Sequence, residues 1–194
     1  MADSKQIWAA TRPVDCGVFY RAPLGTSMPT IATAPWATLP AAWLDHGWMG
    51  DDGMANGMKR DVTDHQAFGG DIVKTTQNKY TETIKATCFE TNPNVLKTVF
   101  GDANVVVAGT SHRQITVTHS SLPLLRSCFI WRCIEGQKTR LVMAQEGQVI
   151  TVDDVVFVNK DLVKYTVTVQ CYKPGPTIDA VVELIDEPDV LPGS

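Results

Sequence analysis

The chain has 194 residues, of which 44% are hydrophobic and 20% are charged, and its formal net charge is −4. These values are ordinary for a globular protein, so they exclude a disordered chain or a coiled coil, and the length fits one domain with its own core. No apolar run is long enough to span a bilayer, and residues 1–11 lack the apolar centre of a signal peptide. We therefore expect a protein that is made and kept in the cytosol unless something releases it.

The first elements are a short strand and a proline-rich connection. Residues 17–21 are predicted to form the strand, and the four prolines in residues 23–40 exclude a long helix or a central strand there. Trp36 lies in this extended segment, where a tryptophan is hard to bury within one subunit. It is a candidate for an intersubunit contact, with the alternative that the segment folds back over the sheet.

A loop is predicted over residues 50–70. A strand at 43–49 ends at Gly-Asp-Asp-Gly, residues 50–53, whose residues tolerate a turn, and residues 57–62 would return as its hairpin partner. Residues 63–71 are polar and glycine-rich, and a strand follows around 72–75. We expect the loop to be poorly ordered in an isolated subunit, because it has little to bury on its own.

The clearest pattern joins a strand to a short helix. Polar and apolar residues alternate along 79–90, as in a half-buried strand, and Glu82 is the one exception. Asn92 can then cap a helix that begins at Pro93 and stops at Gly101. A helix of about two turns is stable only when packed, so it should lie on a sheet through its apolar stripe, formed by Val95, Leu96, Val99 and Phe100.

A series of short strands is predicted for the second half of the chain, at 105–108, 113–119, 127–134, 139–144, 148–152, 162–172 and 178–185. Their close spacing favours an antiparallel meander. The predicted fold is mainly β, an antiparallel sandwich or barrel with one short flanking helix at about residues 93–100. We expect a single domain over residues 1–173 and a C-terminal strand or arm over 174–194.

The C-terminal arm is acidic. Residues 153–194 hold 3 basic and 8 acidic residues, whereas residues 1–152 hold 14 and 13, and no basic stripe of the kind that grips DNA is evident. The apolar residues Val182, Leu184 and Ile185 favour an arm that docks on a neighbouring subunit. The alternative is an acidic tail that only aids solubility.

No motif in the sequence indicates catalysis or a metal. The five cysteines include no C-x-x-C pair, and four lie in apolar strand patterns, as buried free thiols do. His46 stands near Asp45, Asp51 and Asp52 without a ligand spacing. Nucleophile and phosphate-loop motifs are absent, so we predict no catalytic residue, no metal and no cofactor. The alternative is a hydrolase whose catalytic residues come together from distant segments.

The amino-acid sequences of several segments, and their order along the chain, resemble those of the major tail tube proteins of long-tailed, non-contractile phages, above all those infecting actinobacteria. The resemblance covers most of the chain and is carried by YTET at 80–83, ETNPNVLKTVFG at 90–101, WLDHGW at 43–48, GDDG at 50–53 and DLVKYTVTV at 161–169. This resemblance rests on overall sequence similarity and on no catalytic motif.

This resemblance implies a structural virion protein that forms hexameric rings stacked into a tube for DNA. The implied partners are further copies of the chain, the tape measure protein, and the tail terminator and distal tail proteins, with transient passage of DNA and no membrane. Loop residues expected between stacked rings are Asp51, Asp52, Asp64, His65 and Phe68. The alternative is a non-enzymatic β-sandwich module that binds a sugar or a protein.

Overall fold

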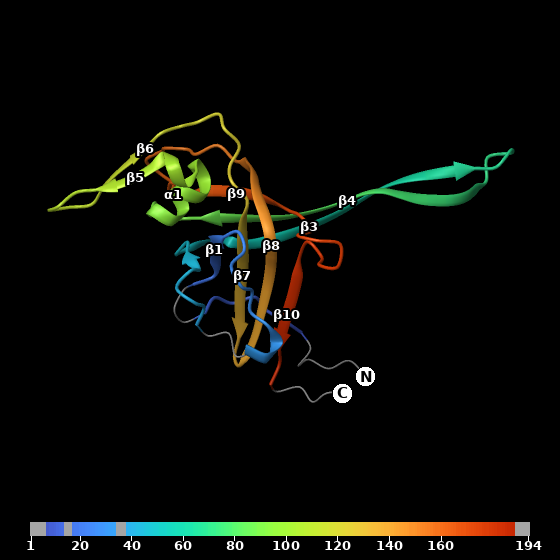
Figure 1. The fold of residues 1–194 in the computed structure, drawn as a ribbon, viewed down its shortest axis with the longest axis horizontal. Helices are drawn as coiled ribbons and strands as arrows, with labels where there is room; N and C mark the ends of the chain where they lie inside the picture. The colour runs from blue at the N-terminus through green and yellow to red at the C-terminus, as the bar shows by residue number, and fades with distance from the viewer. Residues whose placement is uncertain (1–6, 14–16, 34–37, 189–194) are drawn as a thin grey trace.

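The computed structural model describes residues 7–13, 17–33 and 38–188. The described chain is mostly antiparallel β-sheet with a single α-helix, which confirms the predicted fold class (Figure 1). Its elements are β1 (Phe19–Pro23), η2 (Ile31–Thr33), β2 (Leu44–Asp45), β3 (Met49–Gln66), β4 (Ile72–Cys88), α1 (Pro93–Phe100), η3 (Asp102–Asn104), β5 (Val105–Ala108), β6 (Gln114–Val117), β7 (Ser127–Glu135), β8 (Lys138–Val152), β9 (Tyr165–Cys171) and β10 (Val182–Asp186).

Strand β8 joins two parts of one bent sheet. The strand order is β2-β1-β7-β8-β9-β4-β3, and β10 also pairs with β8. Residues 139–143 of β8 pair with β10, and residues 147–152 pair with β9. In Figure 1, β7, β8 and β10 therefore run steeply across the direction of β9, β4 and β3.

The main core lies between these two parts and beneath the helix. Phe19 and Phe129 stack with ring centroids 5.8 Å apart, and both are almost fully buried. Ile84 on β4 and Val169 on β9 contribute from the other part of the sheet. A smaller core forms on the opposite face of β1, β7 and β8 around Ile130, where Trp43 packs.

Helix α1 has the predicted bounds and caps. The Asn92 side chain accepts a hydrogen bond from the Val95 amide at 2.9 Å, and Pro93 is the first helical residue. Gly101 ends the helix at φ 97°, where its amide donates to the Lys97 carbonyl. Val95, Leu96 and Val99 are buried, whereas Phe100 is half-buried with its ring 4.6 Å from that of His119.

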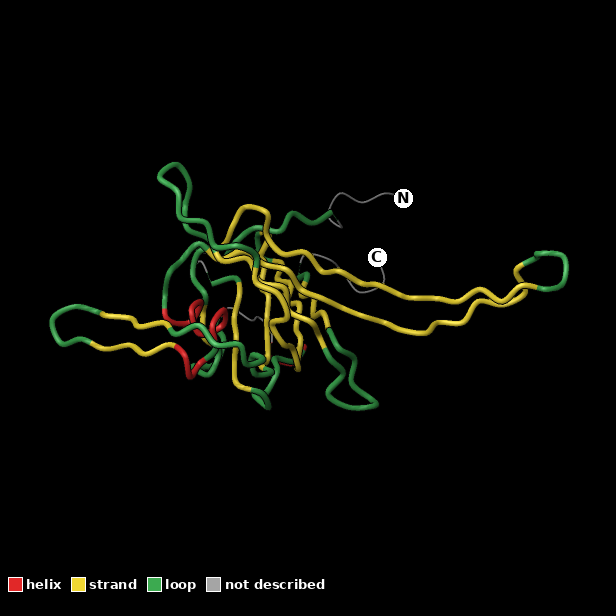
Figure 2. Tube along the Cα trace, turned by 90° about the horizontal axis from the view of Figure 1, so that it is seen from above, coloured by secondary structure: helices red, strands yellow, loops and turns green. Residues whose placement is uncertain are grey.

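Two hairpins project from the body in opposite directions along the longest axis. The longer one is formed by β3 and β4, and the shorter by β5 and β6 (Figures 1 and 2). The loop predicted for residues 50–70 is therefore wrong over most of its length, because β3 runs to Gln66 and leaves only residues 67–71 as the turn. Glycine and aspartate are poor strand formers, but pairing with β4 overrides that weak preference.

The remaining strand predictions differ mainly in their bounds. Asp51 and Asp52 lie within β3, at a shift of register between Met49 and Met54, so no hairpin turn forms there. The strand predicted at 43–49 shrinks to β2, because the chain leaves the sheet at His46. The separate strands predicted at 139–144 and 148–152 are one continuous strand, β8.

Four cysteines are buried free thiols, as predicted: Cys88, Cys128, Cys133 and Cys171. Burial raises the pKa of the Cys88 thiol to about 12, which keeps it protonated and inert. Cys16 lies outside the described residues.

Candidate assembly surfaces

The sheet formed by β3, β4, β9 and the end of β8 has one apolar and one hydroxyl-rich face. Ile84 and Val169 pair across β4 and β9 on the core face. On the other face Thr87 pairs with Thr166, and their hydroxyls lie 2.9 Å apart. That polar face is built from β4 and β9, with residues Thr83, Lys85, Thr87, Thr166, Thr168 and Gln170 at successive paired positions.

Glu82 breaks the alternation of β4 because it lies on the core side. It is 7% exposed and accepts hydrogen bonds from the Asn56 amide at 3.1 Å and the Tyr80 hydroxyl at 2.8 Å. Burial and the bond to Glu82 together raise the pKa of Tyr80. These bonds fasten β3 to β4 where the hairpin leaves the body.

Two charges on the polar face are paired with opposite charges. The Lys85 ammonium lies 2.9 Å from the Asp153 carboxylate, and Lys59 lies 3.3 Å from Asp61. Lys85 occupies the same face as Thr83 and Thr87, and Asp153 follows β8 directly, with its amide bonded to the Thr166 carbonyl. The face is therefore rich in hydroxyls and locally neutral at Lys85.

This four-stranded sheet has an unpaired edge on each side. Among the described residues, β3 pairs only with β4, and the pairing of β8 with β7 stops at Gly147. Within the described part of the chain, residues 148–152 of β8 then pair only with β9. Unpaired edges present backbone donors and acceptors to another chain, so each side of the sheet can extend into a second copy.

The long hairpin separates the residues that the sequence grouped in one loop. Asp51 and Asp52 lie at its base, whereas Asp64, His65 and Phe68 lie at or near its tip. At the tip, Thr75 donates to the Asp64 carboxylate at 2.6 Å, and His65 lies 2.9 Å from the Thr76 hydroxyl. Phe68 is fully exposed, which gives the tip an apolar end with no contact to the body.

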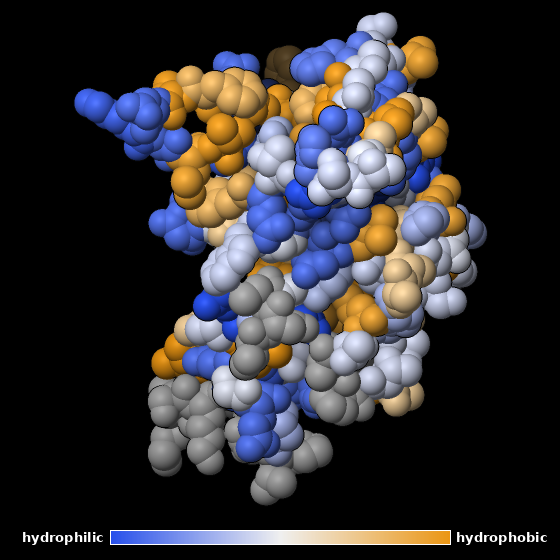
Figure 3. All heavy atoms as spheres, turned by 90° about the vertical axis from the view of Figure 1, so that its left-hand side faces the viewer, coloured by the Kyte–Doolittle hydropathy of each residue, from blue (hydrophilic) through white to orange (hydrophobic). Residues whose placement is uncertain are grey.

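The shorter hairpin and the loops beside it were missed as a candidate surface. Val106 on β5, Leu122, Leu125 and Phe157 are large, exposed apolar side chains. Figure 3 shows hydrophobic residues gathered on the upper part of this end of the molecule. The signal in the sequence is the apolar run at 155–158, which lies in a connection where no sheet buries it.

The intersubunit candidates near the C-terminus lie on β10, which pairs with β8 of the same chain. Leu184 is half-buried against the smaller core, and Val182 and Ile185 are partly exposed. The sequence predicted that this segment docks on a neighbouring subunit, whereas in the structure it pairs with β8 of its own subunit. The arm is also tied by Glu187, which accepts from the Trp8 indole at 2.6 Å. Trp36 lies outside the described residues.

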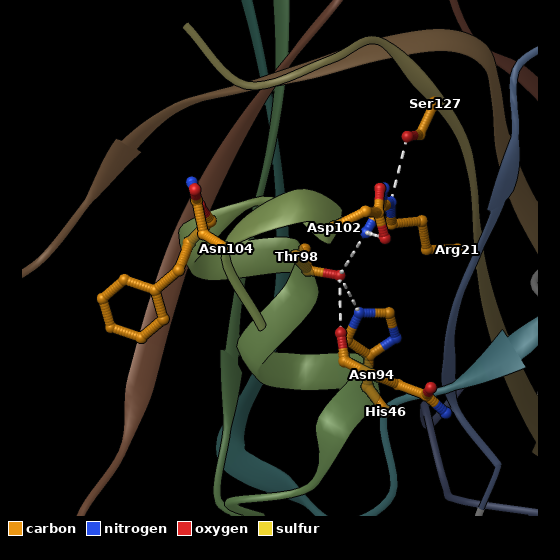
Figure 4. A network of polar contacts seen from close by, with 8 residues as sticks. Arg21, His46, Asn94, Thr98, Asp102, Asn104 and Ser127 are labelled. Carbon is orange, nitrogen blue, oxygen red and sulfur yellow. Dashed lines mark hydrogen bonds and ion pairs between the residues drawn. The ribbon is translucent and has the colours of Figure 1, made fainter. Parts of the chain in front are cut away.

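His46 is a structural residue in the core. It is fully buried, with Nδ1 3.1 Å from the Phe19 carbonyl and Nε2 2.8 Å from the Thr98 hydroxyl (Figure 4). Arg21 reaches the same hydroxyl and pairs with Asp102. Within residues 7–13, 17–33 and 38–188, no group of three metal-ligating side chains occurs, and no helix is long and apolar enough to cross a membrane.

The sheet has unpaired edges, one apolar face and one polar face, and two hairpins project from the body. These features define a class of β-proteins that make contacts with further protein chains. The chain belongs to the phage tail tube protein family, whose model matches residues 1–187. It is a structural component of a tail tube, and membership implies a place in the virion tail and self-assembly with other tail proteins.

A solved structure similar to this chain is the tube terminating cap of the anti-feeding prophage. The two share 9% sequence identity with a TM-score of 0.47, over 96% of this chain and 100% of that one. No curated protein sequence matches this chain.

Proposed function

We propose that this chain is the major tail tube subunit of a siphophage with an actinobacterial host. Its hexameric rings stack into the tube that conducts DNA from the capsid to the host, and they assemble in the host cytoplasm. The tail type and the host rest on the resemblance of the sequence alone. The tape measure protein would occupy the lumen during assembly, and terminator and distal tail proteins would meet the two ends.

The observation that carries the proposal is the four-stranded sheet with its two unpaired edges. When the β3 edge of one subunit pairs with residues 148–152 of β8 in the next, six sheets close into one barrel. Twenty-four strands about 4.8 Å apart and tilted about 40° enclose a ring roughly 48 Å across between backbones. A DNA duplex fits through such a ring with room for side chains and water.

The chemistry of the sheet supports its polar face as the lining of the lumen. Its core face is already covered within the subunit, so the hydroxyl-rich face is the one left to meet solvent. A strongly basic wall would bind phosphates and slow the passage of DNA. A wall of threonines with a paired lysine avoids that attraction.

The long hairpin supports contacts between stacked rings. From Asp52 to His65 the strand β3 spans roughly 40 Å at the usual rise per residue, so the tip lies well beyond the body. Phe68 at the tip would then be buried against the next ring, and Asp64 and His65 would lie beside it. The β5–β6 hairpin, which projects the opposite way, would meet the ring on the other side.

The test is negative-stain electron microscopy of the purified protein, together with two matched variants. Ile150 lies on the unpaired edge of β8 and Ile72 lies in the long hairpin, and their exposures are similar, 50% and 59%. The wild type should form rings or tubes, Ile150→Asp should remain a folded monomer, and Ile72→Asp should form rings that stack poorly.

A compact wild-type monomer at high concentration would overturn the proposal. Stabilisation of that monomer by a sugar or peptide would instead identify a binding module. Normal tubes from Ile150→Asp would show that the ring closes through another edge.

A further inference from the structure

The ion pair between Lys85 and Asp153 lies on the face proposed to line the lumen. Lys85 lies at the middle of the part of β4 that pairs with β9, with Ala55 on β3 and Thr168 on β9 as its direct cross-strand neighbours. Neither neighbour carries a charge. Asp153, which follows the last residue of β8, supplies the opposite charge at 2.9 Å from the ammonium.

Stability does not account for this pair. About half of each side chain remains exposed to solvent, 51% for Lys85 and 46% for Asp153. An exposed pair of this kind contributes between zero and about 1 kcal/mol, because water screens the attraction and two long side chains lose freedom. Its geometric position is the more informative property, since it neutralises a cation in the centre of the polar face.

We propose that Asp153 masks the charge of Lys85, so that the tube wall does not hold DNA by its phosphates. This inference rests on the proposed function. Each subunit places Lys85 in the part of the wall formed by β4 and β9, and a ring repeats that charge around the circumference. Without Asp153, every stacked ring would offer a circle of free ammonium groups to the duplex.

The physical consequence is retention of DNA that depends on salt. Each phosphate neutralised by a lysine releases condensed counterions, and contributes about 0.9 to the slope of log affinity against log salt. A ring of six unmasked lysines would therefore lose roughly a thousandfold in affinity for DNA between about 50 mM and 200 mM salt. The paired wild-type wall lacks this dependence.

The experiment compares tubes assembled from purified subunits in the presence of short duplex DNA. After dilution, a nuclease is added and the protected DNA is measured at low and high salt. Wild-type tubes should release the DNA to the nuclease, whereas Asp153→Asn tubes should retain it at low salt and release it at high salt. Circular dichroism and microscopy check that the variant subunits fold and that their tubes are normal.

Two variants serve as controls. Asp154→Asn removes the same net charge one residue further on, at a carboxylate for which no ion pair is found within the described part of the chain. The double variant Lys85→Gln, Asp153→Asn removes both charges of the pair. Both should behave as the wild type.

Retention by Asp154→Asn equal to that of Asp153→Asn would overturn the masking proposal, because net charge alone would then explain the result. Normal Asp153→Asn tubes without DNA retention would also overturn it and leave the proposed function standing. Absence of tubes from the wild type would instead refute the proposed function itself.

Discussion

His46 Nε2 lies 2.8 Å from the hydroxyl of Thr98, although 52 positions separate these residues in the chain. Because Nδ1 faces the Phe19 carbonyl, Nδ1 carries the proton in the neutral ring, and Nε2 accepts from the Thr98 hydroxyl. The same hydroxyl lies 2.9 Å from the Asn94 carbonyl, to which it can donate instead. This contact ties the chain after β2 to helix α1.

Acidification should destabilise the subunit through His46. Burial lowers the pKa of His46 to about 4 from its ordinary value of 6.5, so the unfolded chain binds a proton that the folded chain excludes. The contribution of neutral His46 to the free energy of unfolding is fully present above pH 6.5 and is lost as the pH falls toward 4. The loss amounts to roughly 3 kcal/mol over that window.

Denaturant unfolding at neutral and acid pH measures this effect. His46→Gln should be less stable than the wild type at neutral pH and lose less stability on acidification. The exposed His65 provides the matched control, and His65→Gln should keep the wild-type dependence. An unchanged dependence in His46→Gln would show that other groups carry it.

Leu96→Asp should prevent folding of the subunit as well as its assembly. Leu96 is 4% exposed and packs in the main core, and an unpaired carboxylate buried there costs several kcal/mol. Ala103→Asp adds the same carboxylate at an exposed site just after the helix and should fold normally. Circular dichroism and thermal melting distinguish the two; a Leu96→Asp melting temperature equal to that of the wild type would contradict the packing of α1.

Shortening the tip of the long hairpin should stop stacking without unfolding the body. Deletion of residues 64–69, or the milder Phe68→Ser, removes groups that contact nothing in the core. We expect folded subunits with wild-type thermal stability that form rings and no long tubes in electron micrographs. Tubes of normal length from both variants would exclude the tip from the ring contact.

Truncation after Lys173 should destabilise even the monomer. It removes β10, which pairs with five residues of β8, and Ala180, which is buried in the main core. The expected loss is about 2–4 kcal/mol, measured by denaturant unfolding at concentrations too low for assembly. Unchanged monomer stability combined with lost tube formation would show that the strand acts on a neighbour.

The helix and its caps were predictable because their signals are local. Asn92, Pro93 and Gly101 each act on backbone groups within a few residues, so their roles can be read from spacing. The alternation along β4 and β9 was equally readable, because each strand buries one face. The family resemblance then supplied an expectation of assembly that local patterns do not contain.

The long hairpin and the ion pair between Lys85 and Asp153 could not be predicted from local sequence signals. Residues of β3 beyond the body are exposed on both faces, so no alternation of burial marks them as a strand. Lys85 and Asp153 meet only because β4, β9 and β8 lie side by side, and 68 positions separate them in the sequence. Glu82 breaks its pattern for a similar reason, because its partner Asn56 comes from another strand.

The route of β8 through the sheet also sets when a newly made chain can join a tube. The β3–β4 hairpin is local and can pair early, but Thr83 meets Gln170 only after nearly the whole subunit has left the ribosome. Until β9 arrives, β4 and β8 have no strand between them. Half-made chains therefore lack the complete four-stranded sheet that is proposed to close a ring, and the fold delays that step until synthesis is nearly complete.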